Sequence, residues 1–138
     1  MFKTSQEIPI MASRKYISTD RAPAAIGPYS QAVKVDSLLF ISGQIPLDPS
    51  TMELVNESVE AQAIQVFENL NAVVTAAGGT LADVVKLNIY LSDMCYFEIA
   101  NEVMQRYMNE PYPARAALAV KELPKKVDIE IEGVASID

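Results

Sequence analysis

The segment Y-P-A-R-A-A-L-A-V, residues 112–120, carries one arginine, Arg115, in an otherwise apolar run. The guanidinium of this arginine needs acceptors, because it stays charged and presents five N–H donors. Glutamates alternate with isoleucines in a later segment, residues 127–135, which supplies Glu130 and Glu132. Two arrangements are open: an ion pair between strands or subunits, or a cleft in which Arg115 holds a substrate carboxylate bidentately while Glu130 handles protons.

Missing residue types exclude other chemistries. The chain has no histidine and a single cysteine, Cys95. A Ser-His-Asp triad, a Cys-His pair, an imidazole-ligated metal and an intrachain disulfide are therefore ruled out. We expect no metal and no cofactor. The net charge of -7 argues against nucleic acid or an anionic membrane as a partner, because phosphate binding needs clustered Lys and Arg. No apolar run approaches the ~20 residues that span a bilayer.

The N-terminal segment M-F-K-T-S-Q-E-I-P-I lacks a continuous apolar core, which argues against a secretory signal. A second methionine, Met11, follows it. We expect residues 1–13 to be an extension and residues 14–138 to form one domain. We expect a cytoplasmic location. A mitochondrial transit peptide is the alternative, opposed by Glu7 and by the lack of arginine before Arg14.

Two helices are predicted from apolar residues spaced three or four apart. Six such residues recur over 59–77, after a candidate cap at Asn56 or Ser58 and before Gly78-Gly79, which would end the helix. A second helix is predicted over about residues 96 to 108.

Strands are predicted from alternating apolar and polar residues. The segment 32–46 is typical of two strands around a turn at Asp36-Ser37, and the other predicted strands are 84–91, with Val85, Leu87, Ile89 and Leu91 on one face, 114–120 and 127–135. The order β-β-α-β-α-β-β predicts an α+β fold, with two helices on one face of a mainly antiparallel sheet.

The sheet face away from the helices has a mixed composition in this prediction. If the last two strands pair, Arg115, Glu130 and Glu132 lie there together, with Phe40 and Ser42 nearby. Such a face is too apolar for a solvated surface and too charged for a monomer's core. We therefore expect a homo-oligomer whose sheets face one another and whose charged residues form sites between subunits.

Five motifs occur in order: A-P-A-A-I-G-P-Y-S-Q-A, F-I-S-G-Q-I-P-L-D-P, a helix ending in A-A-G-G, P-A-R-A-A-L-A-V and D-I-E-I-E-G-V-A. With them the chain closely resembles the Rid/YjgF family, the reactive intermediate deaminases or 2-iminobutanoate/2-iminopropanoate deaminases. The resemblance covers about residues 18–136. P-A-R, followed some fifteen residues later by I-E-I-E, is its most specific part.

The resemblance implies a chorismate-mutase-like fold and a homotrimer with a central barrel and a cleft at each subunit interface. The family's carboxylate-binding arginine matches Arg115, and its glutamate associated with the hydrolytic water matches Glu130. The other implied substrate-binding positions are Tyr29, Ser42, Gly43, Asn101 and the main chain of Ala117. Many relatives carry Cys at this last position, but a main-chain contact survives that change.

The implied activity is hydrolysis of small 2-imino acids to 2-keto acids and ammonia, without a cofactor. Two alternatives stay open. One is a regulatory trimer that binds small carboxylates without turnover. The other is an endoribonuclease or translation inhibitor, an activity attributed to some relatives. The absent histidine and the net charge of -7 both argue against the last, because RNA cleavage commonly uses His and RNA binding needs a basic face.

Overall fold

The computed structural model describes residues 12–138. In chain order the elements are β1 (Arg14–Ile17), β2 (Ala32–Val35), β3 (Leu38–Gln44), α1 (Val59–Ala76), η1 (Leu81–Asp83), β4 (Val84–Leu91), η2 (Met94–Tyr96), α2 (Phe97–Tyr107), β5 (Ala114–Ala119), η3 (Pro124–Lys126) and β6 (Ile129–Ser136). Nearly all of the expected extension, residues 1–13, lies outside the described residues. Within the described part of the chain, no helix is long and apolar enough to cross a membrane.

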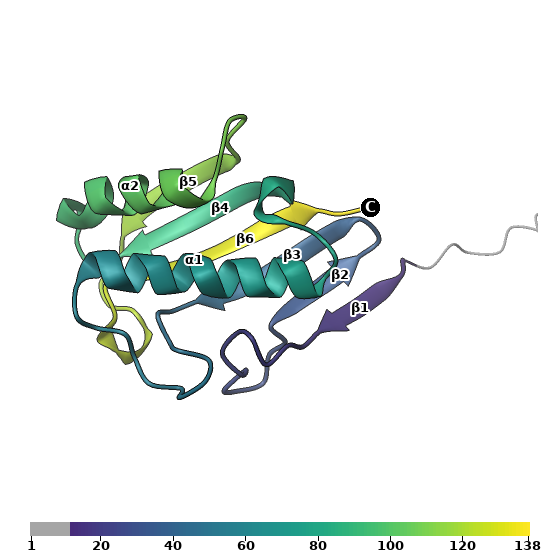
Figure 1. The fold of residues 1–138 in the computed structure, drawn as a ribbon, viewed down its shortest axis with the longest axis horizontal. Coiled ribbons are helices and arrows are strands. Elements are labelled where there is room, and N and C mark those ends of the chain that lie inside the picture. Colours follow the sequence, from purple (N-terminus) through teal and green to yellow (C-terminus); the bar gives the residue numbers. More distant parts are fainter. Residues whose placement is uncertain (1–11) are drawn as a thin grey trace, which may run out of the picture.

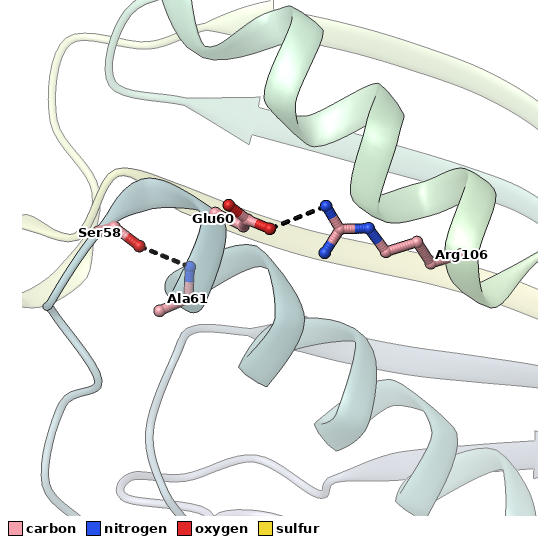
Figure 2. A network of polar contacts seen from close by, with 4 residues as sticks. All are labelled: Ser58, Glu60, Ala61 and Arg106. Atoms are coloured by element: carbon pink, nitrogen blue, oxygen red, sulfur yellow. Dashed lines mark hydrogen bonds and ion pairs between the residues drawn. The ribbon is translucent and has the colours of Figure 1, made fainter.

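Helix α1 begins where the capping pattern predicts. Of the two candidate caps, Ser58 fulfils the role: its side-chain oxygen accepts a hydrogen bond from the Ala61 N–H at 3.0 Å (Figure 2). Glu60 in the first turn of α1 pairs with Arg106 in the last turn of α2, at 2.8 Å (Figure 2). Both charges also suit the dipoles of their helices. Because the pair is half-exposed, it contributes only about 0.2–1 kcal/mol. Helix α1 stops before Gly78, whose φ of 95° is costly for other residues.

Six strands form one sheet in the order β1-β2-β3-β6-β4-β5. The β4–β5 pair is parallel and the others are antiparallel. Both helices cover the same face of this sheet (Figure 1). The predicted α+β architecture is confirmed. The prediction omitted β1, because its four residues form an exposed edge strand without the alternation that identifies a half-buried strand.

The last two strands do not pair, so the condition under which Arg115 and Glu130 would share a face is not met. β4 lies between β5 and β6, parallel to one and antiparallel to the other. The parallel β4–β5 pair follows from the helix between them: α2 is the crossover that returns the chain to the same direction. No local sequence signal specifies that the last strand then inserts beside β4 instead of β5.

The core lies between the helices and the sheet. Phe67 and Leu70 of α1 pack there with Leu87 and Ile89 of β4, all almost fully buried. The prediction that Val85 shares a face with Leu87 is wrong, since Leu87 is buried whereas Val85 is 47% exposed. The register between β4 and β6 shifts at the start of β4, so Val84 turns inward instead.

The other face of the sheet, called the open face below, is not covered by either helix (Figure 1). Its large apolar side chains Leu38, Phe40 and Leu118 are 42%, 47% and 43% exposed. Pairing along β4 and β6 puts the polar side chains of Asn88 and Glu130 on the same face. The open face therefore has the predicted mixture of apolar and charged residues.

Candidate functional site

Apart from Ala117, the residues expected to form one site lie in two separate pockets. The first, the glutamate pocket, has a volume of about 490 Å³ and is lined by Tyr29, Ser42, Gly43, Lys125, Glu130 and Glu132, among others. The second, the arginine pocket, has a volume of about 390 Å³ and is lined by Asn101, Met104, Gln105, Tyr112, Pro113 and Arg115.

Glu130 lies at the junction of β6 and β3, and its carboxylate occupies the space beside Gly43. A Cβ added to Gly43 would overlap the Glu130 Oε2 atom and lie 3.0 Å from Cδ. Burial raises the pKa of Glu130 above its usual value, and the negative charge of Glu132 raises it further. Hydrogen bonds from the described residues do not offset this effect. Glu130 is thus a half-buried carboxyl group whose oxygens are available to a ligand or a water.

Glu132, two residues further along β6, has a different environment. Its Oε2 atom accepts hydrogen bonds from the Tyr90 hydroxyl at 2.7 Å and from the Asn88 side-chain amide at 3.1 Å. Both partners belong to β4. The two glutamates therefore lean in opposite directions across β6: Glu130 toward β3 and Glu132 toward β4.

Tyr29 is carried into the glutamate pocket by the loop between β1 and β2. Its hydroxyl accepts a hydrogen bond from the Ile26 N–H at 3.3 Å, and nearly half of the residue is exposed. Ser42 joins this loop to β3, because its hydroxyl donates to the Ser30 carbonyl at 2.6 Å. The predicted positions Tyr29, Ser42 and Gly43 therefore share a wall of one pocket with Glu130.

Two buried amides hold the walls of this pocket. Gln31, only 5% exposed, accepts a hydrogen bond from the Thr19 N–H at 2.7 Å and donates to the Pro23 carbonyl at 2.8 Å. Asn69 of α1 donates to the Leu47 carbonyl at 3.0 Å, beyond β3. Sequence reasoning missed both roles, since each residue is an ordinary amide in its own segment and its partner lies elsewhere.

Arg115 points from β5 toward α2. Its Nη1 atom donates to the Asn101 side-chain oxygen and lies 3.7 Å from the Met104 sulfur. Its guanidinium carbon lies 5.3 Å from the centre of the Phe97 ring, a cation–π contact. Phe97, Asn101 and Met104 are spaced four and three residues apart in α2, so they lie on one face of that helix. This spacing is a signal that could have identified them. The contacts to α2 engage one side of the guanidinium fork.

The main chain at Ala117 is placed to contact a ligand. The Val120 N–H donates to the Leu91 carbonyl of β4. Backbone groups alternate between the two edges of a strand, so the N–H of Ala117 points to the other edge. β5 is the last strand of the sheet, and that edge is free of any strand of the described chain. The predicted main-chain role of Ala117 is compatible with this position.

Arg115 and Glu130 do not share a sheet face, as they would have done if the last two strands paired. Arg115 pairs with Leu87, whose side chain is buried beneath the helices, whereas Glu130 pairs with Tyr90 on the open face. Strand spacing puts their Cα atoms about 14 Å apart, from two inter-strand steps and three residues along β4. Within one chain they cannot hold the same small molecule.

Several lining residues were not predicted. Tyr112 and Gln105 belong to the arginine pocket, and Lys125 belongs to the glutamate pocket. Tyr112 precedes Arg115 by three residues, so its proximity was visible in the sequence. Lys125 adopts a left-handed conformation, with φ of 55°, which sequence patterns did not indicate. Among residues 12–138, no group of three or more His, Cys, Asp or Glu side chains could hold a metal ion.

Comparisons with known proteins agree with the motifs. Residues 19–137 match the model of the family described as Endoribonuclease L-PSP. The chain is 48% identical over 122 residues to the human protein named 2-iminobutanoate/2-iminopropanoate deaminase, with 88% of this chain and 89% of the human protein covered.

Two solved structures have a similar fold. RidA from a Psychrobacter species has a TM-score of 0.87 and 54% identity, covering 89% of this chain and 99% of that one. Escherichia coli TdcF with bound serine has a TM-score of 0.85 and 42% identity, covering 90% and 99%. The chain therefore has the chorismate-mutase-like fold that the resemblance implied.

Proposed function

The chain belongs to the Rid/YjgF family, and on that premise we propose that it hydrolyses reactive 2-imino acids to 2-keto acids and ammonia. The observation that carries the proposal is the state of Glu130. This carboxyl group is half-buried, carries a raised pKa and lies against Gly43 in a pocket with Tyr29. Such a group is suited to proton transfer with a bound water.

Arg115 would bind the carboxylate of the substrate R–C(=NH)–COO⁻. Its contacts to α2 engage Nη1, so the rest of the guanidinium fork faces the arginine pocket. Two charge-assisted hydrogen bonds to a carboxylate would fix the imine carbon relative to the pocket. Asn101 and the Phe97 ring hold the guanidinium in place for this role.

Glu130 would orient the attacking water and accept its proton. The new C–O bond forms as the C=N π electrons move to nitrogen, and Glu130 would pass the proton of the water to that nitrogen, giving a carbinolamine. Glu130 would then carry the proton of the new hydroxyl to the amino nitrogen as the C–N bond breaks, so that the hydroxyl becomes the keto group. The products are a 2-keto acid and ammonia. The imine is already electrophilic, so positioning and proton transfer are sufficient.

The two pockets would be joined between subunits. A protomer cannot bring Arg115 and Glu130 to one imine, because they lie on opposite faces of the sheet. A neighbouring copy could supply the missing half. The apolar side chains of the open face, with Phe40 and Leu118 nearly half exposed, favour a sheet-to-sheet contact in the homotrimer that the resemblance implied.

Two other activities would use the same pockets. Binding of a carboxylate without turnover is favoured by one relative, whose structure contains serine. An endoribonuclease activity is favoured by the description of the family model. The net charge of -7 argues against the second, because RNA binding needs clustered positive charge.

One experiment separates these activities. 2-Iminopropionate or 2-iminobutyrate is generated in situ by an amino-acid oxidase, and ammonia release is followed with and without the protein. We expect faster release with the wild type and no acceleration with Glu130→Gln. Binding of 2-keto acids or serine without acceleration would favour the regulatory alternative. Cleavage of single-stranded RNA that depends on Glu130 would favour the ribonuclease.

A further inference from the structure

The open face carries a second carboxylate whose role the proposed function does not use. Glu132 lines the same pocket as Glu130 and lies two residues away on the same face of β6. A like charge at this position is unfavourable unless something holds it there. Here it is held by two donors from β4, the hydroxyl of Tyr90 and the amide of Asn88.

The two donors act on only one of the two glutamates. Glu132 accepts both hydrogen bonds on the same oxygen, Oε2. The Glu130 side chain points the other way, toward Gly43 of β3, where any side chain at residue 43 would displace the Glu130 carboxyl group. The sequence I-E-I-E thus yields two carboxylates with different surroundings: one tied to β4 and one directed into the pocket.

We propose that Glu132, locked in place by Tyr90 and Asn88, is a positioning residue that makes Glu130 the carboxyl group in the pocket that carries the exchangeable proton. This inference rests on the proposed function for its catalytic meaning, but its physical content does not depend on turnover. A fixed negative charge beside Glu130 strengthens the affinity of this carboxylate for a proton, so Glu130 is the better acceptor of the proton that passes from the water to the nitrogen.

The other groups around Glu130 do not supply this charge. β3 contributes Ser42 and Gly43, which are uncharged. The loop before β2 contributes the Tyr29 hydroxyl, and η3 contributes Lys125, a cation that would act in the opposite sense. On β4, Lys86 is paired with Val134, further along the sheet. The burial of Glu130 and the charge of Glu132 raise its pKa together.

Carbon-13 NMR titration of the full-length protein, labelled at the glutamate side-chain carboxyl carbons, tests this inference directly. The Glu130 signal is assigned from its loss in Glu130→Gln. Glu132→Gln removes the charge but keeps an amide oxygen that can accept from Tyr90. We expect the Glu130 midpoint to shift to lower pH in this variant. Tyr90→Phe should give a smaller shift in the same direction, because the carboxylate of Glu132 is then free to move away.

The matched control is Glu102→Gln, which removes one charge from an exposed position of α2. It should leave the Glu130 midpoint unchanged. An unchanged midpoint in Glu132→Gln, or an equal shift in the control, would overturn the inference, since Glu132 would then only join strands. If the protein hydrolyses imines, the pH dependence of kcat/KM should move with the NMR midpoint. Absence of turnover would contradict the proposed function, but the titration would still decide whether Glu132 acts on Glu130.

Discussion

The carboxylate of Glu130 fills the space that a side chain at Gly43 would occupy. The two residues come from neighbouring strands, β3 and β6, where the ladder between them is irregular. The absence of a side chain at residue 43 therefore sets where the carboxyl group of residue 130 lies.

Gly43→Ala should impair activity far more than stability. The added Cβ would overlap the end of a flexible side chain, which can swing aside with little cost in folding free energy. The carboxyl group would be displaced by about 1 Å or more, enough to cost on the order of 10²-fold in rate. Imine hydrolysis and thermal unfolding measure the two effects. Gly78→Ala is the matched control: its Cβ would meet nothing, but φ of 95° should lower Tm with activity unchanged.

Arg115→Lys should lower kcat/KM on the order of 10²-fold, because lysine offers a point charge instead of a planar fork. Arg115→Ala should be at least as damaging. Both proteins should assemble as the wild type does, since Arg115 contacts α2 of its own chain. Steady-state kinetics with sedimentation measure both properties. Near-normal turnover in Arg115→Lys would contradict bidentate binding, and loss of assembly in both would indicate an ion pair between subunits.

Substitutions at Tyr29 test whether this residue only covers the substrate or takes part in the chemistry. Tyr29→Phe keeps the ring and loses the hydroxyl that accepts from the Ile26 N–H, which should cost about 0.5–1.5 kcal/mol, or several-fold in rate. Tyr29→Ala should be markedly worse, because it removes a wall of the glutamate pocket. Comparison of kcat/KM for the three proteins tests this order. Equal and negligible effects would place Tyr29 outside the site.

Leu118→Asp should abolish both assembly and turnover. The wild type should sediment as a trimer at micromolar concentration, because sheet-to-sheet contacts should bury well over ~1,000 Å² per interface. A charge in the apolar part of the open face would oppose that contact. Met94→Asp is the matched control, since Met94 is equally exposed but lies in η2. A folded wild-type monomer, or assembly of Leu118→Asp, would contradict the interface.

Glu130→Gln should stabilise the fold at neutral pH. The folded-state pKa of Glu130 is raised, so the contribution of this group to stability is full below its unfolded-state pKa and is lost as pH rises through the folded value. Glutamine does not titrate. The gain in unfolding free energy on substitution should therefore be larger at pH 7 than at pH 3. Urea unfolding at both values measures it, and a gain that does not change with pH would contradict the raised pKa.

The sequence predicted the elements better than their assembly. The apolar spacing and the cap at Ser58 located α1 within a residue or two, and alternation located the strands from β2 onward. The order of the strands could not be predicted, because the insertion of β6 beside β4 depends on contacts between distant segments. The register shift at the start of β4, which places Val85 on the opposite face, could not be predicted for the same reason.

The candidate site shows the same division. Residue types and motifs identified Arg115 and Glu130 as candidates, and the structure places Arg115 against Asn101 and leaves Glu130 half-buried beside the charge of Glu132. Their separation onto two faces followed only from the topology. The hydrogen bonds from Tyr90 and Asn88 to Glu132 depend on register between β4 and β6, which alternation alone does not specify.

The separation of Arg115 and Glu130 onto opposite faces has a genetic consequence. On the proposed assembly, each site takes its arginine from one gene product and its glutamate from another. A chain without Arg115 and a chain without Glu130 are then each inactive alone. In a mixed oligomer, a complete site forms where the Glu130 of the first chain meets the Arg115 of the second. Two such alleles would complement each other within a single mixed oligomer.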